Sequence, residues 1–361
     1  MTVVDGWVTT VTGPVEAASL GHVAPHEHLV SDSSAQVVAL YEGPAERRAA
    51  LGIDEADREL LMAPMDIRNL GWIRRHAMNV DNLRLDDREA TLEALADFRG
   101  LGGTAIVECT PIGLGRDPLA LRELSQASGV LVVMGSGWYL ADFHPAELDA
   151  ADTGRLREEI LRDLTVGVDD TGVRSGIIGE IGTGWPLHPA ERLVLQAAAQ
   201  AQRASGAAMQ IHPGRHPEAP AAVLRVLDEA GADLTKVSVS HLDRTLTDPA
   251  DLVEIARTGC YLEFDMFGQE STYYPYGWFE VPNDGARVRL LEALVERDLL
   301  GQLLISQDTG YRSLLPRWGG TGYAHILREV VPLLRRRGWS PADVDRLTRT
   351  NPARWLSRNG A

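Results

Sequence analysis

The stretch Gly21-His22-Val23-Ala24-Pro25-His26-Glu27-His28-Leu29-Val30 decides the fold of this chain. It opens a series of short β-like runs that alternate with amphipathic helical stretches, and this alternation is typical of a parallel sheet covered by helices. A doubly wound open sheet would need a phosphate-binding glycine loop after the first strand, but His26, Glu27 and His28 stand there. The sequence therefore favours a closed barrel over an open sheet.

The number of β-like runs is eight, as in a (β/α)8 TIM barrel of the α/β class. The runs are 22–30, 104–111, 130–139, 176–182, 208–213, 237–242, 260–267 and 303–308. Helix-period segments lie between them, for example at 87–101, 189–205 and 217–230, and a glycine follows each of these three. A length of 361 residues with 44% hydrophobic residues fits a single barrel domain over residues 1–361.

Two regions exceed the ideal barrel unit. Residues 31–85 separate the first strand from the first convincing helix and predict a long excursion over the barrel mouth, with helical patches at 54–62 and 67–78. After the last strand, segment 311–322 leads into a helix at 323–337. Extra C-terminal helices are expected at 341–348 and 352–357.

Composition excludes several functions. The formal net charge of -16 opposes binding to nucleic acid, which needs a surface rich in lysine and arginine. No apolar stretch reaches the roughly 18 residues that span a bilayer, and the N-terminus lacks the regions of a signal peptide. We therefore expect a cytoplasmic protein that binds neither nucleic acid nor membranes. Cys109 and Cys260 stand in apolar runs, where buried reduced thiols are expected.

The histidine pair of the first run suggests a metal site. His26 and His28 are two residues apart, so on a strand their imidazoles point to the same face and can share one ion. Alone, such a pair is more often packed and hydrogen-bonded than metallated. However, other runs also end in potential ligands, namely Glu180, His212, His241 and Asp308. Strand ends meet at the mouth of a barrel, and four imidazoles with two carboxylates fit two divalent ions, first Zn2+ and otherwise Co2+ or Mn2+.

Glu180 has a second interpretation. It stands at the end of the apolar run 176–182, where burying an unpaired carboxylate is costly, so it must meet a cation or a strong donor. A structural salt bridge to an arginine would satisfy it as well as a metal would.

Several motifs together give the chain a resemblance to a known family. They are residues 179–187 (Gly-Glu-Ile-Gly-Thr-Gly-Trp-Pro-Leu), 211–215 (Ile-His-Pro-Gly-Arg), 240–245 (Ser-His-Leu-Asp-Arg-Thr), 306–308 (Ser-Gln-Asp) and 319–326 (Gly-Gly-Thr-Gly-Tyr-Ala-His-Ile). With them, essentially the whole chain resembles the phosphotriesterase-related branch of the amidohydrolase superfamily. The resemblance implies a homodimeric hydrolase in which one metal is bound by His26, His28 and Asp308 and the other by His212 and His241, with a carboxylate and a hydroxide bridging the two.

The chain departs from the best-known members of that family at the bridge. Those enzymes use a carboxylated lysine at the end of the fourth strand, where this chain has Glu180. Lys236 is the only lysine, and it stands at the start of the sixth run, at the opposite end of the barrel. A carbamate bridge is therefore excluded. The resemblance narrows to glutamate-bridged relatives associated with esters, lactones and N-acyl amides.

Three further residues receive roles at the barrel mouth. Asp308 lies beside the attacking hydroxide that two metal ions generate, and it is expected either to accept the proton of that hydroxide or to act only as a ligand. Tyr139, at the end of the third run, is assigned by its family position a hydrogen bond to the substrate, although it could instead pack as a rim aromatic.

Arg244 follows His241 by three residues. It could bind an anionic group of the substrate, but a salt bridge to Asp243 or Asp248 is an equal alternative.

Three functions remain open from sequence. The first is a binuclear-metal hydrolase that cleaves a small-molecule carboxylic ester, lactone or N-acyl amide. The second is a phosphotriester or organophosphate hydrolase with the same metals, and the third is a non-catalytic small-molecule binding protein of the same fold. The presence of all six expected ligands argues against the third.

Overall fold

In the computed structural model, which describes residues 4–146, 148, 152–271, 274, 276 and 280–358, eight parallel strands close into a barrel. They form one sheet in the order β12-β11-β10-β9-β8 and another in the order β3-β6-β7. Backbone hydrogen bonds join the two sheets from Gly179 N to Ser136 O (2.6 Å) and from Asp308 N to His26 O (3.2 Å). The strands are β3 (His22–Glu27), β6 (Gly103–Glu108), β7 (Leu131–Met134), β8 (Ile177–Gly182), β9 (Ala208–His212), β10 (Val237–Val239), β11 (Tyr261–Phe264) and β12 (Leu303–Ile305).

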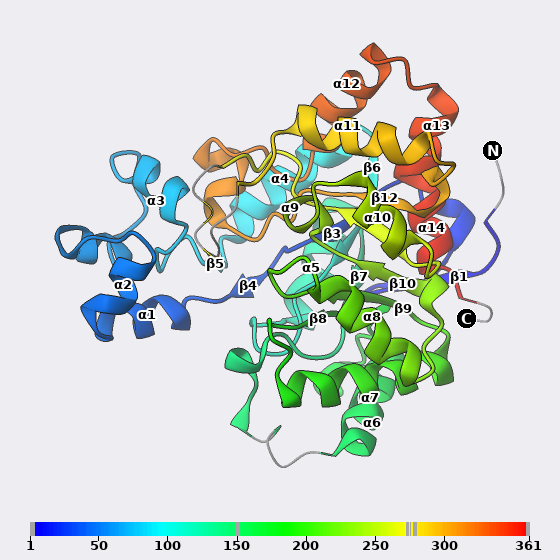
Figure 1. Cartoon of the computed structure of the whole chain (residues 1–361), viewed down its shortest axis with the longest axis horizontal. Coiled ribbons are helices and arrows are strands. Elements are labelled where there is room, and N and C mark those ends of the chain that lie inside the picture. Colours follow the sequence, from blue (N-terminus) through cyan, green and yellow to red (C-terminus); the bar gives the residue numbers. More distant parts are fainter. Residues whose placement is uncertain are drawn as a thin grey trace.

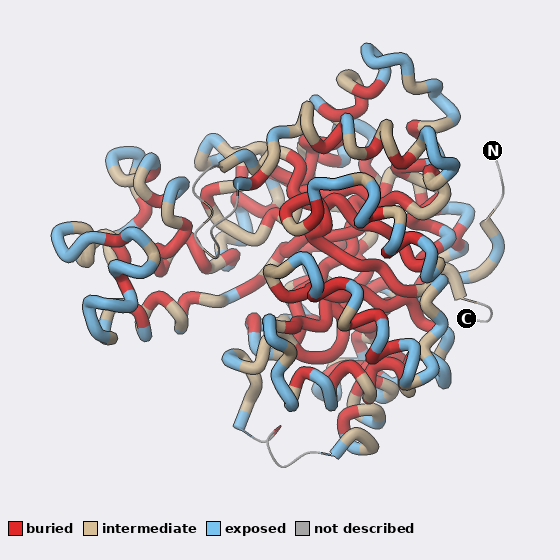
Figure 2. Tube along the Cα trace, viewed as in Figure 1, coloured by how far each residue is buried: buried red, intermediate tan, exposed pale blue. Residues whose placement is uncertain are grey.

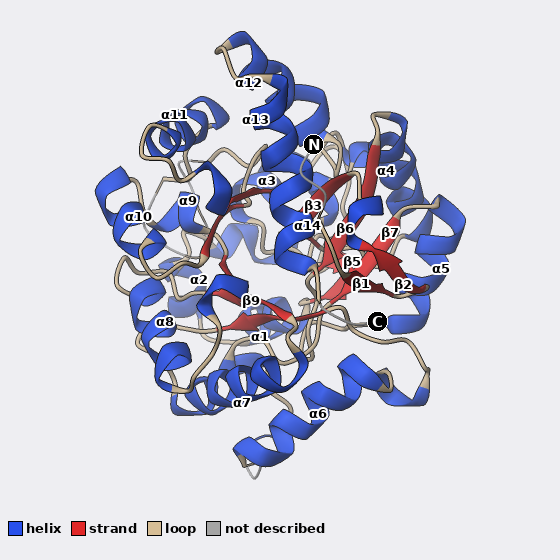
Figure 3. Ribbon diagram, turned by 90° about the vertical axis from the view of Figure 1, so that its right-hand side faces the viewer, coloured by secondary structure: helices blue, strands red, loops and turns tan. Residues whose placement is uncertain are grey.

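The predicted (β/α)8 TIM barrel is confirmed, and each of the eight predicted runs contains one strand. Figure 3 shows the strands inside a ring of helices. The helices are α1 (Ala35–Glu42), α2 (Ala45–Ala50), α3 (Leu70–His76), α4 (Arg88–Gly100), α5 (Pro118–Ser128), α6 (Thr153–Thr165), α7 (Pro189–Ser205), α8 (Ala219–Glu229), α9 (Leu242–Thr245), α10 (Pro249–Ala256), α11 (Asp284–Val295), α12 (Val331–Arg336), α13 (Pro341–Asp345) and α14 (Asn351–Leu356). No helix in the described ranges is both long and apolar enough for a membrane span.

Helix boundaries follow the local signals in most places. Asp87 accepts a hydrogen bond from Ala90 N and begins α4, and Gly206 ends α7 in the left-handed region at φ 65°. The helix predicted from residue 217 begins only at Ala219, because residues 214–219 form a turn in which Ala219 N donates to His216 O.

The C-terminal helices run together instead of forming two separate units. A wide turn of π-helix, Arg346–Thr350, joins α13 to α14 without the predicted break. Pro352 is the second residue of α14, which follows this wide turn directly. A second π-helical turn, Ile326–Val330, precedes α12 inside the predicted helix 323–337.

The barrel bottom is closed by an element that sequence did not predict. An antiparallel hairpin of β1 (Trp7–Thr10) and β2 (Gly13–Glu16) packs there, and Val11 N donates to Val132 O. Trp7 also pairs with Arg358 beyond α14, so the two ends of the chain meet at this side. In Figure 1, β1 and α14 lie at the side opposite to α1, α2 and α3.

The excursion 31–85 is present and extends from the barrel, as Figure 1 shows. Its ends are tied by the short antiparallel pair β4 (Ser31–Asp32) and β5 (Arg84–Leu85). Between them it contains α1, α2, a 3-10 helix (Glu55–Leu61) and α3. The excursion has a small apolar core of its own, made of Val37, Leu40, Ile53, Leu61, Met78, Val80 and Leu83. Figure 2 shows this buried segment apart from the larger buried interior of the barrel.

Inside the barrel, side chains change from apolar to polar toward the mouth. Every second residue of a strand points inward, so β11 and its extension contribute first Tyr261, then Glu263 and then Asp265. All three are buried, and the first packs with apolar residues of the barrel bottom. The two cysteines are buried free thiols, as expected.

Lys236 lies at the bottom of the barrel. Its Nζ donates to the carbonyl oxygens of Arg354 (2.8 Å), Trp355 (3.1 Å) and Ser357 (2.7 Å), which belong to the C-terminal end of α14 and the residue after it. The lone lysine therefore stabilises a helix end and lies far from the mouth.

We expect Lys236→Met to lower the free energy of unfolding by about 1–3 kcal/mol, because three carbonyl groups lose a charged donor. Urea denaturation would measure this, with Lys236→Arg as the control that keeps the charge. The far-UV circular dichroism in the absence of denaturant should stay at the wild-type level. Unchanged stability in Lys236→Met would show that these three hydrogen bonds do not hold the end of α14.

Candidate metal centre

The six predicted ligands lie together, with the buried carboxylate of Glu180 in β8 at their centre. Its Oε2 lies 3.0 Å from His212 Nδ1, 3.5 Å from His241 Nε2 and 3.7 Å from His26 Nε2. Its Oε1 lies 3.5 Å from His28 Nε2. Asp308 Oδ1 lies 3.4 Å from His28 Nε2 and 3.6 Å from His26 Nε2. Ligand atoms from opposite sides of the barrel thus surround one carboxylate.

Local backbone geometry aims Glu180 into the centre. The β8–β9 ladder is irregular between Ile178 and Ile181, the segment that contains Glu180. Gly179 has a φ of 122°, and a Cβ built on it would lie 2.2 Å from Gln210 O. Only glycine fits this position, so the Gly-Glu pair of the motif is required by the close approach of two strands.

His241 and Asp308 lie just beyond their strands rather than within them. Their φ angles are 57° and 49°, in the left-handed region that few non-glycine residues adopt. Each backbone amide donates a hydrogen bond that holds its position: His241 N to the side-chain Oδ2 of Asp265 (3.0 Å), and Asp308 N to the carbonyl oxygen of His26 (3.2 Å). Non-glycine residues held in this conformation concentrate at functional sites.

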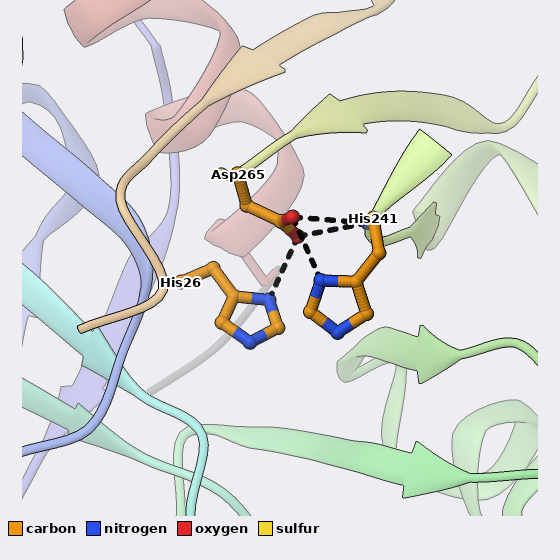
Figure 4. A group of neighbouring side chains, drawn as sticks. All are labelled: His26, His241 and Asp265. Carbon is orange, nitrogen blue, oxygen red and sulfur yellow. Dashed lines mark hydrogen bonds and ion pairs between the residues drawn. The ribbon is translucent and has the colours of Figure 1, made fainter. Parts of the chain in front are cut away.

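Asp265 links two of the histidines from behind. Its Oδ2 lies 3.1 Å from His26 Nδ1, and its Oδ1 lies 2.8 Å from His241 Nδ1, as Figure 4 shows. Because each Nδ1 faces this carboxylate, each Nε2 is turned toward the central cluster. Asp265 was not among the residues predicted from sequence. It nevertheless stands near the end of the apolar run 260–267, as the predicted ligands do in their own runs.

His28 is held by a polar partner in a similar way. His28 Nδ1 lies 2.9 Å from Thr110 Oγ1, and the hydroxyl of Thr110 donates to Glu108 Oε1 at 2.5 Å. Two histidines of the first run and one of the sixth thus have their Nδ1 atoms fixed by polar partners, as metal-binding imidazoles commonly do.

The arrangement fits metal ions better than a network of hydrogen bonds alone. His26 Nε2 is fully buried and has no hydrogen-bond partner among the described residues. Burial and the neighbouring His241 lower the pKa of His212 well below its usual value, which leaves the neutral imidazole that a metal ligand requires. No arginine or lysine in the described part of the chain forms an ion pair with Glu180, so the salt-bridge alternative fails. Neighbouring ligand atoms of His26, His28 and Glu180 lie close enough together for one ion, and so do those of Glu180, His212 and His241.

The cluster opens into a cavity of about 260 Å³. Tyr139 lies on its wall, with its hydroxyl 3.4 Å from His212 Nδ1. Arg244 lies on the same wall, with Nη2 3.4 Å from His212 Nε2. Residues of the excursion, Ser31, Ser33 and Gln36, also line the cavity, so the excursion contributes to the pocket.

A TIM barrel with four imidazoles and two carboxylates gathered at its mouth defines the class of metal-dependent hydrolases. The chain belongs to the phosphotriesterase family, whose model matches residues 6–356. The motif-based assignment to this family and to its superfamily is thereby confirmed, and the chain is a hydrolase.

Individual relatives agree with this assignment. The chain is 38% identical to an N-acetyltaurine hydrolase of Homo sapiens over 360 residues, which cover 99% of both chains. A solved structure of a resiniferatoxin-binding protein from Rhodobacter sphaeroides matches with a TM-score of 0.90 and 34% identity, over 98% of this chain and 96% of that one. A phosphotriesterase homology protein from Escherichia coli, solved with phosphate in its active site, matches with a TM-score of 0.76 and 28% identity, over 93% and 99%.

We expect Asp265→Asn to weaken metal binding by about 10- to 100-fold, because an amide no longer fixes the orientation of His26 and His241. Competition with a chromogenic chelator would measure the loss. Asp248→Asn is a matched control, because Asp248 only caps α10 through Ala250 N. Unchanged affinity in Asp265→Asn would mean that both imidazoles are oriented without this carboxylate.

Proposed function

We propose that the chain is a two-metal hydrolase that cleaves small N-acyl amides, and carboxylic esters or lactones by the same chemistry. The observation that carries this proposal is the convergence of four imidazoles and two carboxylates on one cavity, with His26 Nε2 buried and unpartnered among the described residues. Two divalent ions held there would supply hydroxide at neutral pH and positive charge beside the scissile carbonyl oxygen. His26, His28 and Asp308 would hold one ion, His212 and His241 the other, and Glu180 would contact both.

Asp308 is the proposed proton acceptor. Its side chain is 21% exposed, whereas the side chains of the other five ligands are at most 7% exposed, so it alone faces the cavity to a substantial degree. Burial raises the pKa of Asp308, but its contact with His28 and the nearby His26 and His241 outweigh burial and hold it below the usual value. An ionised carboxylate at this place can take a proton and pass it to the leaving amine.

Tyr139 is the proposed hydrogen-bond donor to the substrate. Burial, assisted by the charge of Glu180, raises the pKa of its phenol, so the hydroxyl keeps its proton. A protonated phenol on the cavity wall can donate to an oxygen that gains negative charge as the amide bond is attacked.

The proposal that the enzyme cleaves an amide, ester or lactone bond is supported by the relatives. Several relatives that cover 99% of this chain are N-acetyltaurine hydrolases, and the Deinococcus radiodurans structure with 27% identity and a TM-score of 0.74 is a phosphotriesterase-like lactonase. Both names describe attack on a carbonyl carbon. Hydrolysis of phosphotriesters is the second candidate, favoured by the family assignment and by the organophosphorus hydrolase from the same organism, at 26% identity.

We further propose Zn2+ as the native metal, with Co2+ or Mn2+ as substitutes, because the ligands are mostly nitrogen with some carboxylate oxygen. A homodimer, a cytoplasmic location and a single functional domain over residues 1–361 are proposed from the sequence and the family resemblance.

Metal-replete protein should contain about two equivalents of divalent metal and should hydrolyse N-acyl amino acids or p-nitrophenyl esters in preference to paraoxon. Elemental analysis and a substrate panel would measure both. His26→Ala should lose at least one equivalent and nearly all turnover while the circular dichroism of the barrel persists.

A metal content near one, or turnover in His26→Ala at the wild-type rate, would contradict the proposed centre. If the protein hydrolyses only paraoxon, the substrate would be a phosphoester and not a carbonyl compound. His76→Ala serves as the histidine control, because His76 ends α3 in the excursion, away from the cluster.

Replacing Glu180, the carboxylate proposed to contact both metal ions, gives a second test. Glu180→Gln keeps the shape of the side chain but removes its charge, so it should release at least one metal and lower kcat by about 100-fold or more. Added bicarbonate should not restore this variant. Glu180→Lys is the matched control, because only that variant can be carboxylated, and only it should respond to bicarbonate. Full metal content and turnover in Glu180→Gln would assign the bridge to another residue.

A further inference from the structure

Two cationic side chains in the proposed catalytic cavity form no ion pair with a carboxylate of the described residues. Arg215, in the loop after β9, and Arg244, in α9, both line the cavity that contains Glu180 and Asp308. Neither forms an ion pair with any carboxylate of the described residues, and neither is needed as a metal ligand. A cation held in a pocket without a counter-ion is costly unless an anion joins it.

Arg244 is the more buried of the two, with 3% exposure. Its Nη2 donates to Pro213 O at 3.3 Å, and its Nε is buried without a hydrogen-bond partner in the described structure. The two carboxylates proposed from sequence as its partners are engaged elsewhere. Asp243 pairs with the buried Arg287 at 2.6 Å, and Asp248 caps α10.

The two guanidinium groups point at one place. Arg244 Nη1 donates to the hydroxyl oxygen of Tyr274 at 2.7 Å, and Arg215 Nε donates to the same oxygen at 3.4 Å. Arg215 also stacks over the ring of Tyr276, with its Cζ 4.7 Å from the ring centre, which limits its movement. Guanidinium groups that converge on one oxygen are suited to an anion with several oxygens, such as a sulfonate or a carboxylate.

We infer that Arg215 and Arg244 form a subsite for an anionic group of the substrate, so that the enzyme selects N-acyl amides whose amine half carries a sulfonate or carboxylate. The inference rests on the proposed function, because it concerns which amide the same cavity takes. A neutral triester or a simple lactone would leave both cations unpaired, and polar sites reject ligands that lack the matching group.

The position of the subsite sets the length of the substrate. Arg244 Nη2 lies 3.4 Å from His212 Nε2, and the other nitrogen of that ring, Nδ1, lies 3.0 Å from Glu180 Oε2. One imidazole ring therefore separates the anion subsite from the carboxylate at the centre of the cluster. The scissile carbonyl and the anionic group must be joined by a spacer of only a few bonds.

The experiment compares charged substrates with neutral ones of the same shape, using the metal-replete enzyme. The pairs are N-acetyl-2-aminoethanesulfonate with 2-acetamidoethyl methyl sulfone, and N-acetyl-β-alanine with its primary amide. We expect kcat/KM to be at least about 30-fold higher for one or both anions than for the neutral partner. The better anion identifies the preferred headgroup. Doubling the spacer to four methylenes should remove the advantage.

Arg244→Met and Arg215→Met should each reduce the charged-to-neutral ratio by about 10-fold, mainly through KM, and Arg244→Lys should recover part of it. Arg215 is only half-buried, so its variant remains informative where Arg244→Met folds poorly. Arg225→Met is the matched control, because Arg225 is exposed on α8 outside the cavity.

Equal kcat/KM for the charged and neutral partners, or equal losses on both in the arginine variants, would overturn the subsite. Calorimetric titration with ethanesulfonate separates this failure from failure of the proposed function, because binding needs no turnover. Binding that Arg244→Met and Arg215→Met weaken would support the subsite even in a protein that cleaves no amide. Absence of binding to the wild type would overturn it, whereas cleavage of neutral amides would leave the proposed function intact.

Discussion

The buried carboxylate of Glu180 is the constraint on which the site depends. It is 2% exposed at the centre of the barrel mouth, and burial alone raises its pKa. The contacts of Glu180 with His212, His241 and His26 outweigh burial and hold its pKa well below the usual value. No lysine or arginine among the described residues shares this task, so the charge is left to the histidines and to the metal ions proposed for this site.

The need to surround one carboxylate explains features that lie some distance from it. Gly179 has no side chain because β9 approaches too closely, and Asp265 fixes two imidazoles from the far side. His241 and Asp308 accept left-handed backbone angles beyond their strands. The left-handed angles of these two residues cost free energy, and the apolar layers around and below the mouth supply the rigid frame that maintains them.

The barrel was predictable because its signal repeats. Eight apolar runs alternate with helical periods, and a histidine, aspartate or glutamate at the end of such a run is conspicuous since the end of a barrel strand faces the mouth. That signal located the six side chains that the structure brings together. It overestimated strand length, because the ladders of β10 and β12 stop at Val239 and Ile305 and the backbone then turns to reach the centre.

Features without a repeating signal were not predictable. The hairpin of β1 and β2 is short and half exposed, so it lacks a clear hydrophobic pattern, and the π-helical turn before α14 leaves no mark in composition. Asp265 belongs to the predicted pattern but contacts the cluster from behind, and a one-dimensional pattern cannot distinguish a ligand from the residue that orients it. The convergence of Arg215, from the loop after β9, and Arg244, from α9, likewise appears only in three dimensions.

His212 separates the carboxylate side of the cavity from its guanidinium side. Its Nδ1 faces Glu180 Oε2 and His241 Nε2, and its Nε2 faces Arg244. Burial and His241 keep this imidazole neutral by lowering its pKa, so it adds no charge to either side. The carboxylate side and the guanidinium side of the cavity therefore remain distinct within one small space. Because a single ring sets the distance between them, the spacing of the two sides is fixed by the barrel and not by a mobile loop.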